Sequence, residues 1–176
     1  NKMARLKWQT SLRNGPLYAR LFLMRVLSRK NLDQKEKDLL ISQLRELLSG
    51  KEPVLFAYLY GSFLGEGFFR DIDVAVYFDS RAFKDSSDMF NYSLALSAAC
   101  DMATSGVTFD LRPLNLAPLP FRFDVVTQGR IFYTRDEERR VNFEARTRSL
   151  YFDFLPHLRF YFRSIVLGES DERFRE

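Results

Sequence analysis

Two strongly apolar segments, residues 54–60 and 72–78, constrain the fold of this chain more than any other feature of the sequence. Each is long and hydrophobic enough to form a central strand that is buried on both faces of a sheet. Asp71 and Asp73 stand where the second strand opens, with Ile72 between them. Because residues i and i+2 of a strand project from the same face, we expect the two carboxylates to lie side by side while Ile72 enters the core.

The acidic pair predicts a metal site. Carboxylates this close together repel each other unless a cation neutralises them, and their hard oxygen atoms suit Mg²⁺ or Mn²⁺. Gly61, directly after the first apolar segment, lets the backbone approach a ligand closely. Ser62 is placed to cap a helical turn whose free N–H groups bind phosphate. A phosphate-binding turn beside a metal site indicates nucleotide chemistry, whereas a surface strand after an ordinary Gly-Ser turn is the structural alternative.

This ordered combination resembles the signature of the DNA polymerase β-type nucleotidyltransferase superfamily. Within it, the chain is most similar to the minimal nucleotidyltransferases, and among these to the MntA-like antitoxins encoded beside HEPN-domain toxins. One departure is the loop, because only the eight residues 63–70 separate Ser62 from Asp71 and most relatives have a somewhat longer loop. The resemblance implies an α/β fold, in which a small mixed sheet carries helices mainly on one face and additional helices lie at both ends of the chain.

A third acidic residue, Asp110, lies in a further predicted strand over residues 107–114. By itself, an acid there would be expected on the outer face of an edge strand. In the family that the chain resembles, however, the strand after the preceding helix carries the third active-site carboxylate. The resemblance therefore implies that Asp110 joins Asp71 and Asp73 in holding two Mg²⁺ ions, or Mn²⁺, and that Asp110 accepts a proton from the attacking hydroxyl.

The function implied by the resemblance is transfer of AMP from ATP to a hydroxyl of the cognate HEPN toxin, with release of pyrophosphate and neutralisation of the toxin. Gly61 and Ser62 would hold the β- and γ-phosphates. We leave Arg70 outside the predicted site, because an arginine at the start of a strand is more often simply solvated. Two alternatives remain open: an antitoxin that acts by contact alone, and a small-molecule nucleotidyltransferase of the aminoglycoside-modifying type.

Composition excludes several other classes of protein. A chain of 176 residues with 46% hydrophobic content suits one domain with an ample core. The single cysteine, Cys100, and the single histidine, His157, exclude disulfide frameworks and zinc sites built from several such ligands. Cys100 stands among small residues and is predicted to be buried, while His157 is given a structural or solvent role. No apolar run is long enough to cross a bilayer and no cleavable signal is visible, so we expect a cytoplasmic protein that does not contact membranes.

Charge is unevenly distributed along the chain. The net charge is +4, but residues 1–30 contain eight lysines or arginines and no acid, so the remainder carries −4. A basic arm of this kind suggests contact with an acidic protein surface or with nucleic acid, whereas the acidic remainder is not expected to bind nucleic acid. The predicted organisation is a basic N-terminal extension with one helix over 1–30, a nucleotidyltransferase core over 31–135 and a C-terminal helical segment over 136–176, all within one structural domain.

Helix boundaries follow from capping residues and periodicity. The expected helices run from Pro16 to Lys30, from the capping box at Asp33 to Gly50, from Ser86 or Ser87 through Ala103, from Asn115 to Gly129, and from Asp136 onward with an interruption or kink at Pro156. The aromatic residues of the last helix are too numerous for one narrow stripe, so part of that helix is predicted to form an interface.

Overall fold

The computed structural model of the protein describes residues 30–104 and 107–166. A four-stranded sheet lies at its centre, with the strand order β3-β2-β1-β4. Strands β1 and β2 pair antiparallel, as do β1 and β4, while β2 and β3 are parallel, so the predicted mixed sheet is confirmed. The strands are β1 (Val54–Tyr60), β2 (Asp71–Phe78), β3 (Thr108–Pro113) and β4 (Arg130–Thr134).

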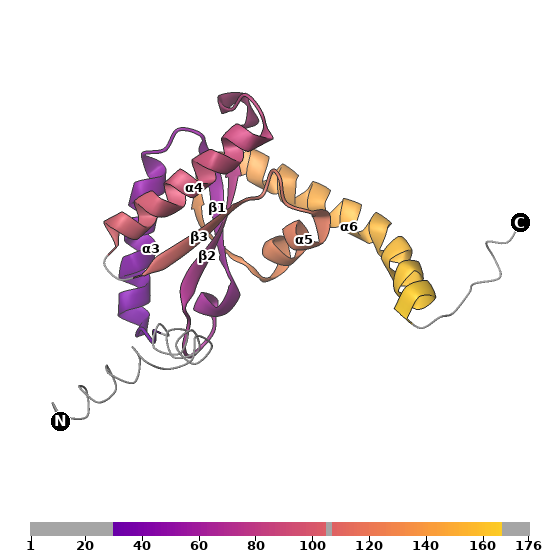
Figure 1. Ribbon diagram of the computed structural model, residues 1–176, viewed down its shortest axis with the longest axis horizontal. Helices are drawn as coiled ribbons and strands as arrows, with labels where there is room; N and C mark the ends of the chain where they lie inside the picture. Colours follow the sequence, from indigo (N-terminus) through magenta and orange to yellow (C-terminus); the bar gives the residue numbers. More distant parts are fainter. Residues whose placement is uncertain (1–29, 105–106, 167–176) are drawn as a thin grey trace, which may run out of the picture.

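Helices cover both faces of this sheet. The helices are α3 (Gln34–Ser49), α4 (Ser86–Ala103), α5 (Leu119–Gln128) and α6 (Glu137–Val166), and two short 3₁₀ turns, η1 (Gly61–Leu64) and η2 (Ser80–Ala82), follow β1 and β2. Helices α3 and α4 lie on one side of the strands, and α5 and α6 lie on the other (Figure 1). The α/β class is therefore as expected, but the expectation that helices pack mainly on one face is corrected.

The alternation of side chains along β1 and β2 explains why both faces are covered. Ala57, Leu59, Ile72 and Val74 belong to a large cluster under α3 and α4. Their neighbours along the strands point the other way into a second cluster under α5 and α6, which contains Phe56, Tyr58, Ala75, Leu114, Val125 and the partly buried Phe143. A strand that is apolar on both faces requires a helix layer on each of them.

Several helix ends agree with the sequence reading, and two do not. Helix α3 begins with the predicted capping box, in which Asp33 accepts from the Glu36 N–H and Glu36 reaches back to the Asp33 N–H. Helix α4 is capped by Asp85, whose carboxylate accepts from the Asp88 N–H at 2.8 Å, and not by either of the following serines. An ionised carboxylate is a stronger acceptor than a hydroxyl at a helix N-terminus, which favours the aspartate.

Asn115 does not begin α5, whose N-cap is Pro118. The Asn115 side chain instead accepts from the Phe78 N–H and donates to the Phe78 carbonyl, both at 2.9 Å. The residue therefore ties the loop after β3 to the end of β2.

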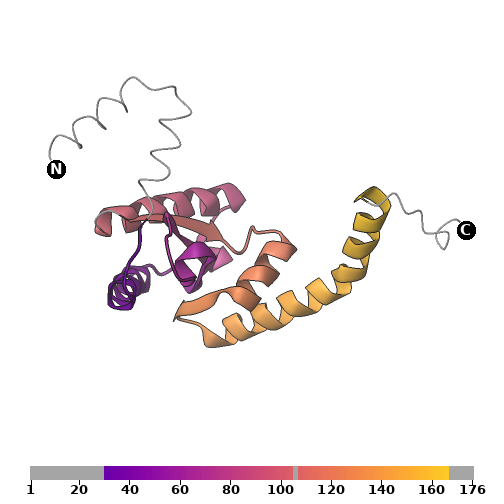
Figure 2. The ribbon, with the colours of Figure 1, turned by 90° about the horizontal axis from the view of Figure 1, so that it is seen from below.

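Helix α6 begins at Glu137, contains Pro156 and is continuous through Val166. Its axis changes direction in its C-terminal half, the half that contains Pro156, and that half projects away from the sheet (Figures 1 and 2). A proline inside a helix removes one backbone hydrogen bond, which accounts for the bend. None of the helices that the structure describes is long and apolar enough to cross a membrane. Cys100 is fully buried, as predicted, whereas the predicted helix at 16–30 falls almost entirely outside the described residues.

Candidate active site

The structure brings the three predicted carboxylates together at one end of β2 and β3. In the parallel pairing of these strands, Asp73 lies directly opposite Asp110, and Asp71 lies two residues before Asp73 on the same face. Ile72 between them is 1% exposed and packs into the core, as predicted. The acids lie on the same face of the sheet as α5 and α6, which cover that face further along the strands. The acids therefore occupy the end of the face that these helices leave uncovered.

Gly61 adjoins the same carboxylates. Its φ is +73°, a conformation that side chains with a Cβ rarely adopt. A Cβ atom placed there would lie 2.3 Å from Oδ2 of Asp73, so only glycine leaves room for this carboxylate. The group that lies close to Gly61 in the structure is the side chain of Asp73, and the approach of a ligand to Gly61 stays a prediction.

Ser62 lies inside the η1 turn and does not cap it. The N-cap is Tyr60, which makes no side-chain capping hydrogen bond. The far end of the turn is held by Lys37, whose Nζ donates to the carbonyls of Phe63 at 3.1 Å and Gly65 at 2.9 Å. The expectation that Ser62 caps a helical turn is therefore corrected, while a phosphate-binding role for Gly61 and Ser62 remains a prediction.

The electrostatics of the acids fit a divalent cation. Burial raises the pKa of Asp73, and the negative charges of Asp71 and Asp110 raise it further, while Arg112 and Arg70 act in the opposite direction. A carboxylate that resists ionisation because of its neighbours is stabilised by any cation that binds among them. Three aspartates are also the oxygen donors that Mg²⁺ and Mn²⁺ prefer. The donor set and its charge therefore suit the metal that the sequence predicts.

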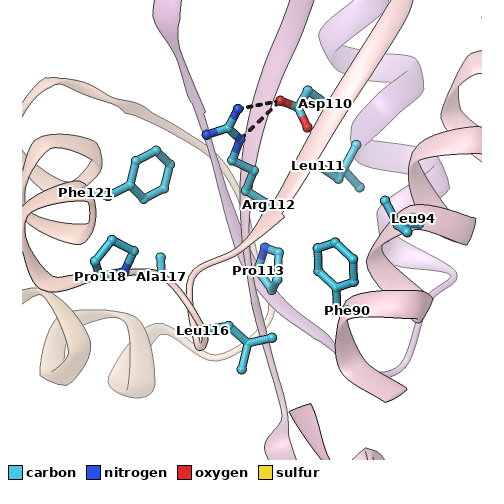
Figure 3. A pocket seen from close by; sticks show the side chains of 10 residues that line it. All are labelled: Phe90, Leu94, Asp110, Leu111, Arg112, Pro113, Leu116, Ala117, Pro118 and Phe121. Atoms are coloured by element: carbon cyan, nitrogen blue, oxygen red, sulfur yellow. Dashed lines mark hydrogen bonds and ion pairs between the residues drawn. The ribbon is translucent and has the colours of Figure 1, made fainter. Parts of the chain in front are cut away.

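The side chains of these three acids, however, are not arranged around a metal position in the structure. Arg70 donates to Oδ2 of Asp71, from Nη2 at 2.8 Å and from Nε at 3.2 Å. Arg112 grips Oδ2 of Asp110 in the same way, at 2.9 and 3.1 Å (Figure 3). Across residues 30–104 and 107–166, no three acidic, histidine or cysteine side chains are arranged so that they could hold a metal ion. Two of the three carboxylates are instead engaged by arginines.

A groove of about 470 Å³ adjoins Asp110 and Arg112. Its walls are mainly apolar side chains from α4, from β3, from the loop after β3 and from α5: Phe90, Leu94, Leu111, Pro113, Leu116, Ala117, Pro118 and Phe121 (Figure 3). The Arg112 guanidinium lies over the Phe121 ring, 5.9 Å from its centroid. The groove thus places an apolar surface directly beside Asp110, the third carboxylate of the cluster.

Sequence reasoning did not identify Arg112 or Tyr60 as part of this site. The alternation that places Asp110 on the active face also places Arg112 there, and this was the available signal. The Tyr60 hydroxyl is buried and has no hydrogen-bond partner within the described part of the chain, and its ring packs edge-on against Phe121 at 5.3 Å. Burial raises the pKa of Tyr60 above its ordinary value, so this hydroxyl stays protonated.

Comparison with known proteins identifies the family. Residues 42–138, which include all five predicted site residues, match the family model described as polymerase beta, nucleotidyltransferase. The chain belongs to the polymerase β nucleotidyltransferase family. No curated protein is significantly similar to it in sequence.

Solved structures with the same fold are found among toxin-antitoxin complexes. A structure of a tri-AMPylated HEPN toxin in complex with an MNT antitoxin from Shewanella oneidensis matches with a TM-score of 0.51 and 23% identity, over 75% of this chain and 97% of the other. A structure of the toxin-antitoxin pair MntA-HepT matches with a TM-score of 0.50 and 24% identity, over 74% of this nucleotidyltransferase and 97% of that chain. A toxin-antitoxin structure with AMP-PNP matches with a TM-score of 0.51 and 23% identity, over 73% of this chain and 96% of the other. At these identities the similarity concerns the fold.

Proposed function

We propose that this nucleotidyltransferase is an antitoxin that uses a divalent metal to transfer AMP from ATP to a hydroxyl of a HEPN-domain toxin. The observation that carries the proposal is the register of β2 and β3, which places Asp73 opposite Asp110 with Asp71 on the same face. The family supplies the reaction class. The antitoxin role is supported by the fold shared with an MNT antitoxin bound to a tri-AMPylated HEPN toxin.

In this mechanism Asp71, Asp73 and Asp110 would hold two divalent cations. When bound, these would supply positive charge for the oxygens of an in-line displacement at the α-phosphate. The chain itself supplies orientation: the η1 turn with Gly61 and Ser62 faces the phosphates, and Asp110 accepts the proton of the attacking hydroxyl. The α-phosphorus–oxygen bond to pyrophosphate breaks as the bond to the acceptor oxygen forms, and pyrophosphate leaves.

The apolar groove beside Asp110 favours a protein acceptor over an aminoglycoside. Aminoglycosides are polycationic sugars and require several carboxylates and hydrogen-bond acceptors around them. The groove offers aromatic and aliphatic walls, one carboxylate and the cationic Arg112. A hydroxyl that is carried by an apolar side chain suits these walls better.

One observation favours the second candidate, an antitoxin that neutralises its toxin by contact alone. Two of the three carboxylates are engaged by arginines, as expected if the acids had lost their catalytic use. An Asp110→Ala variant separates the two candidates. The wild type and the variant are mixed with the HEPN protein, Mg²⁺ and ATP labelled at the α-phosphate, and the label on the HEPN protein and its toxicity are followed.

If the protein is a transferase, Asp110→Ala should still bind ATP, but transfer should fall by at least about 10²–10⁴-fold, the usual contribution of a positioned base. Asp124→Ala, at an exposed aspartate on α5, is the matched control and should label the toxin at the wild-type rate. Neutralisation of the toxin by both Asp110 forms without any label would establish the contact mechanism. Equal labelling by both forms would show that Asp110 is not the third carboxylate.

A further inference from the structure

The two arginines at the acid cluster bind carboxylates in closely similar ways. Each guanidinium directs Nε and Nη2 at a single oxygen, Oδ2, of an aspartate one or two residues away. A guanidinium carries only donors, and it therefore occupies lone pairs that a metal ion would also use. The Arg112–Asp110 pair is the more exposed, with 55% of the Arg112 side chain and 44% of the Asp110 side chain accessible, against 50% for Arg70 and 29% for Asp71. An exposed ion pair stabilises only weakly, so a ligand can break it.

Arg112 differs from Arg70 in what surrounds it. Arg112 is held between Asp110, to which it donates two hydrogen bonds, and the Phe121 ring. The side chain therefore stands between the carboxylate of β3 and the groove, on the same face as all three acids. With Oδ2 of Asp110 held by Arg112 and Oδ2 of Asp71 held by Arg70, the described residues present no group of three carboxylates arranged for a metal ion.

We propose that Arg112 is a positioning residue that holds Asp110 away from the metal position, so that the three-carboxylate site is incomplete until this ion pair breaks. The inference rests on the proposed function, because it concerns the metal site of that reaction. Its consequence is that the free protein binds a divalent ion more weakly than its three aspartates would allow. The metal and Arg112 compete for the same carboxylate, and removing the guanidinium favours the metal.

The test is Mn²⁺ binding to the full chain in the absence of nucleotide, measured from the electron paramagnetic resonance signal of free Mn²⁺. Arg112→Gln should bind Mn²⁺ roughly 1.5- to fivefold more tightly than the wild type, the range that corresponds to the free energy of an exposed ion pair. Arg112→Lys keeps the charge but loses the paired Nε and Nη2 donors. Its Mn²⁺ affinity should lie between those of the wild type and Arg112→Gln. Asp73→Asn should bind far more weakly, which shows that the ion measured is at this site.

Arg81→Gln is the matched control. Arg81 grips Asp79 with the same Nε and Nη2 donors, but this pair lies beyond the opposite end of β2. The variant changes the net charge by the same amount and removes the same kind of ion pair, and it should leave Mn²⁺ affinity unchanged. If Arg81→Gln increased Mn²⁺ affinity as much as Arg112→Gln does, the proposal would be overturned, because the change in total charge would then explain both increases.

A double-mutant cycle tests whether Arg112 acts through Asp110. In an Asp110→Asn background there is no carboxylate to hold, so Arg112→Gln should no longer strengthen Mn²⁺ binding. An undiminished gain in that background would refute the positioning role, as would identical affinities of the wild type and Arg112→Gln. If the wild type, Arg112→Gln and Asp73→Asn all fail to bind Mn²⁺, the metal dependence of the proposed function fails together with this inference, an outcome distinct from the others.

Discussion

At the scale of single residues, Gly61 is the position where backbone and site depend most directly on each other. Gly61→Ala introduces a Cβ atom at a φ of +73° and 2.3 Å from Oδ2 of Asp73. We expect a loss of about 1–3 kcal/mol in the free energy of unfolding from the backbone strain, and weaker metal binding because Asp73 must rotate away. Urea denaturation and Mn²⁺ binding measure the two effects.

Gly65→Ala is the control for this substitution. Gly65 belongs to the same loop, but a Cβ atom there would meet only the Ser62 carbonyl, at an ordinary contact distance of 3.5 Å. The variant should be close to the wild type in both measurements. Equal effects of the two substitutions would mean that the contact between Gly61 and Asp73 is not important.

Asp73 is expected to lower the stability of the metal-free protein at neutral pH. Burial, followed by the charges of Asp71 and Asp110, raises its pKa above the ordinary aspartate value of about 3.9. The folded state therefore binds the proton more tightly than the unfolded chain, and this contribution to stability is lost as the pH rises through the raised pKa.

In metal-free buffer, Asp73→Asn should consequently be more stable than the wild type at pH 7. Its advantage should shrink as the pH falls and vanish below the ordinary aspartate pKa, where both the folded and the unfolded wild type are protonated. Urea denaturation over a pH series measures the difference, with Asp124→Asn as an exposed control. An Asp73→Asn protein that is less stable than the wild type at pH 7 would contradict the crowding of charge at the site.

At the scale of secondary-structure elements, Glu144 fastens α6 to the sheet. The Tyr58 hydroxyl of β1 donates to Oε1 of Glu144 at 2.5 Å, and Arg140 and Arg148 on α6 form ion pairs with the same carboxylate. The Glu144 side chain is 15% exposed, so its hydrogen bonds are only weakly screened by solvent. This contact holds α6 over the face that carries the acids.

Glu144→Ala leaves the Tyr58 hydroxyl without its acceptor and removes one of the two carboxylates that Arg140 contacts. We expect a loss of about 1.5–3 kcal/mol in the free energy of unfolding, the range for hydrogen bonds to a charged group. Chemical denaturation checks this value. Glu138→Ala, at an exposed position of the same helix, should change stability little, and a similar loss in both variants would show that the contact with β1 is not what matters.

At the scale of the whole molecule, the C-terminal half of α6 stands apart from the domain (Figure 2). The stack of Tyr151 on Phe123 of α5, with ring centroids 3.7 Å apart, lies near the end of the packed part of the helix. Beyond it several large apolar side chains are exposed: Phe154, Phe160, Tyr161, Phe162 and Ile165. Exposed aromatic residues in this number indicate a surface that a partner covers.

A chain that ends at Asp153 should therefore fold with a free energy of unfolding within about 1 kcal/mol of the full chain, because none of the removed side chains that the structure describes is buried. Its complex with the HEPN protein should weaken by about tenfold or more, since each aromatic anchor of an interface is typically worth at least about 2 kcal/mol. Calorimetric titration of the two proteins measures this. A chain that ends at Val166 keeps the whole helix and is the control. Loss of folding in the shorter chain would instead assign the helix end to the core.

Much of the fold was predictable because it depends on local patterns. The capping box at Asp33, the burial of Cys100 and the strand from Val54 to Tyr60 follow from residues close together in the chain. The errors arose where several residues competed for one local role. Asp85 caps α4 in place of the serines that follow it, and Asn115 hydrogen bonds to β2 instead of starting a helix. Sequence pattern identifies such candidates, but the surrounding structure selects among them.

For the candidate site, the sequence by itself determined that Asp71 and Asp73 share one face of a strand, because strand alternation is a local property. The contact between Gly61 and Asp73 depends on the pairing of β1 with β2. Only the tertiary structure decided that Asp110 lies opposite Asp73. The register between β2 and β3 depends on how α4, which connects the two strands in the sequence, packs against the sheet. It also decided which helices cover the acidic face. The Arg112–Asp110 pair is local, because strand alternation places both on one face, whereas the Phe121 ring of α5 beside Arg112 is a tertiary contact.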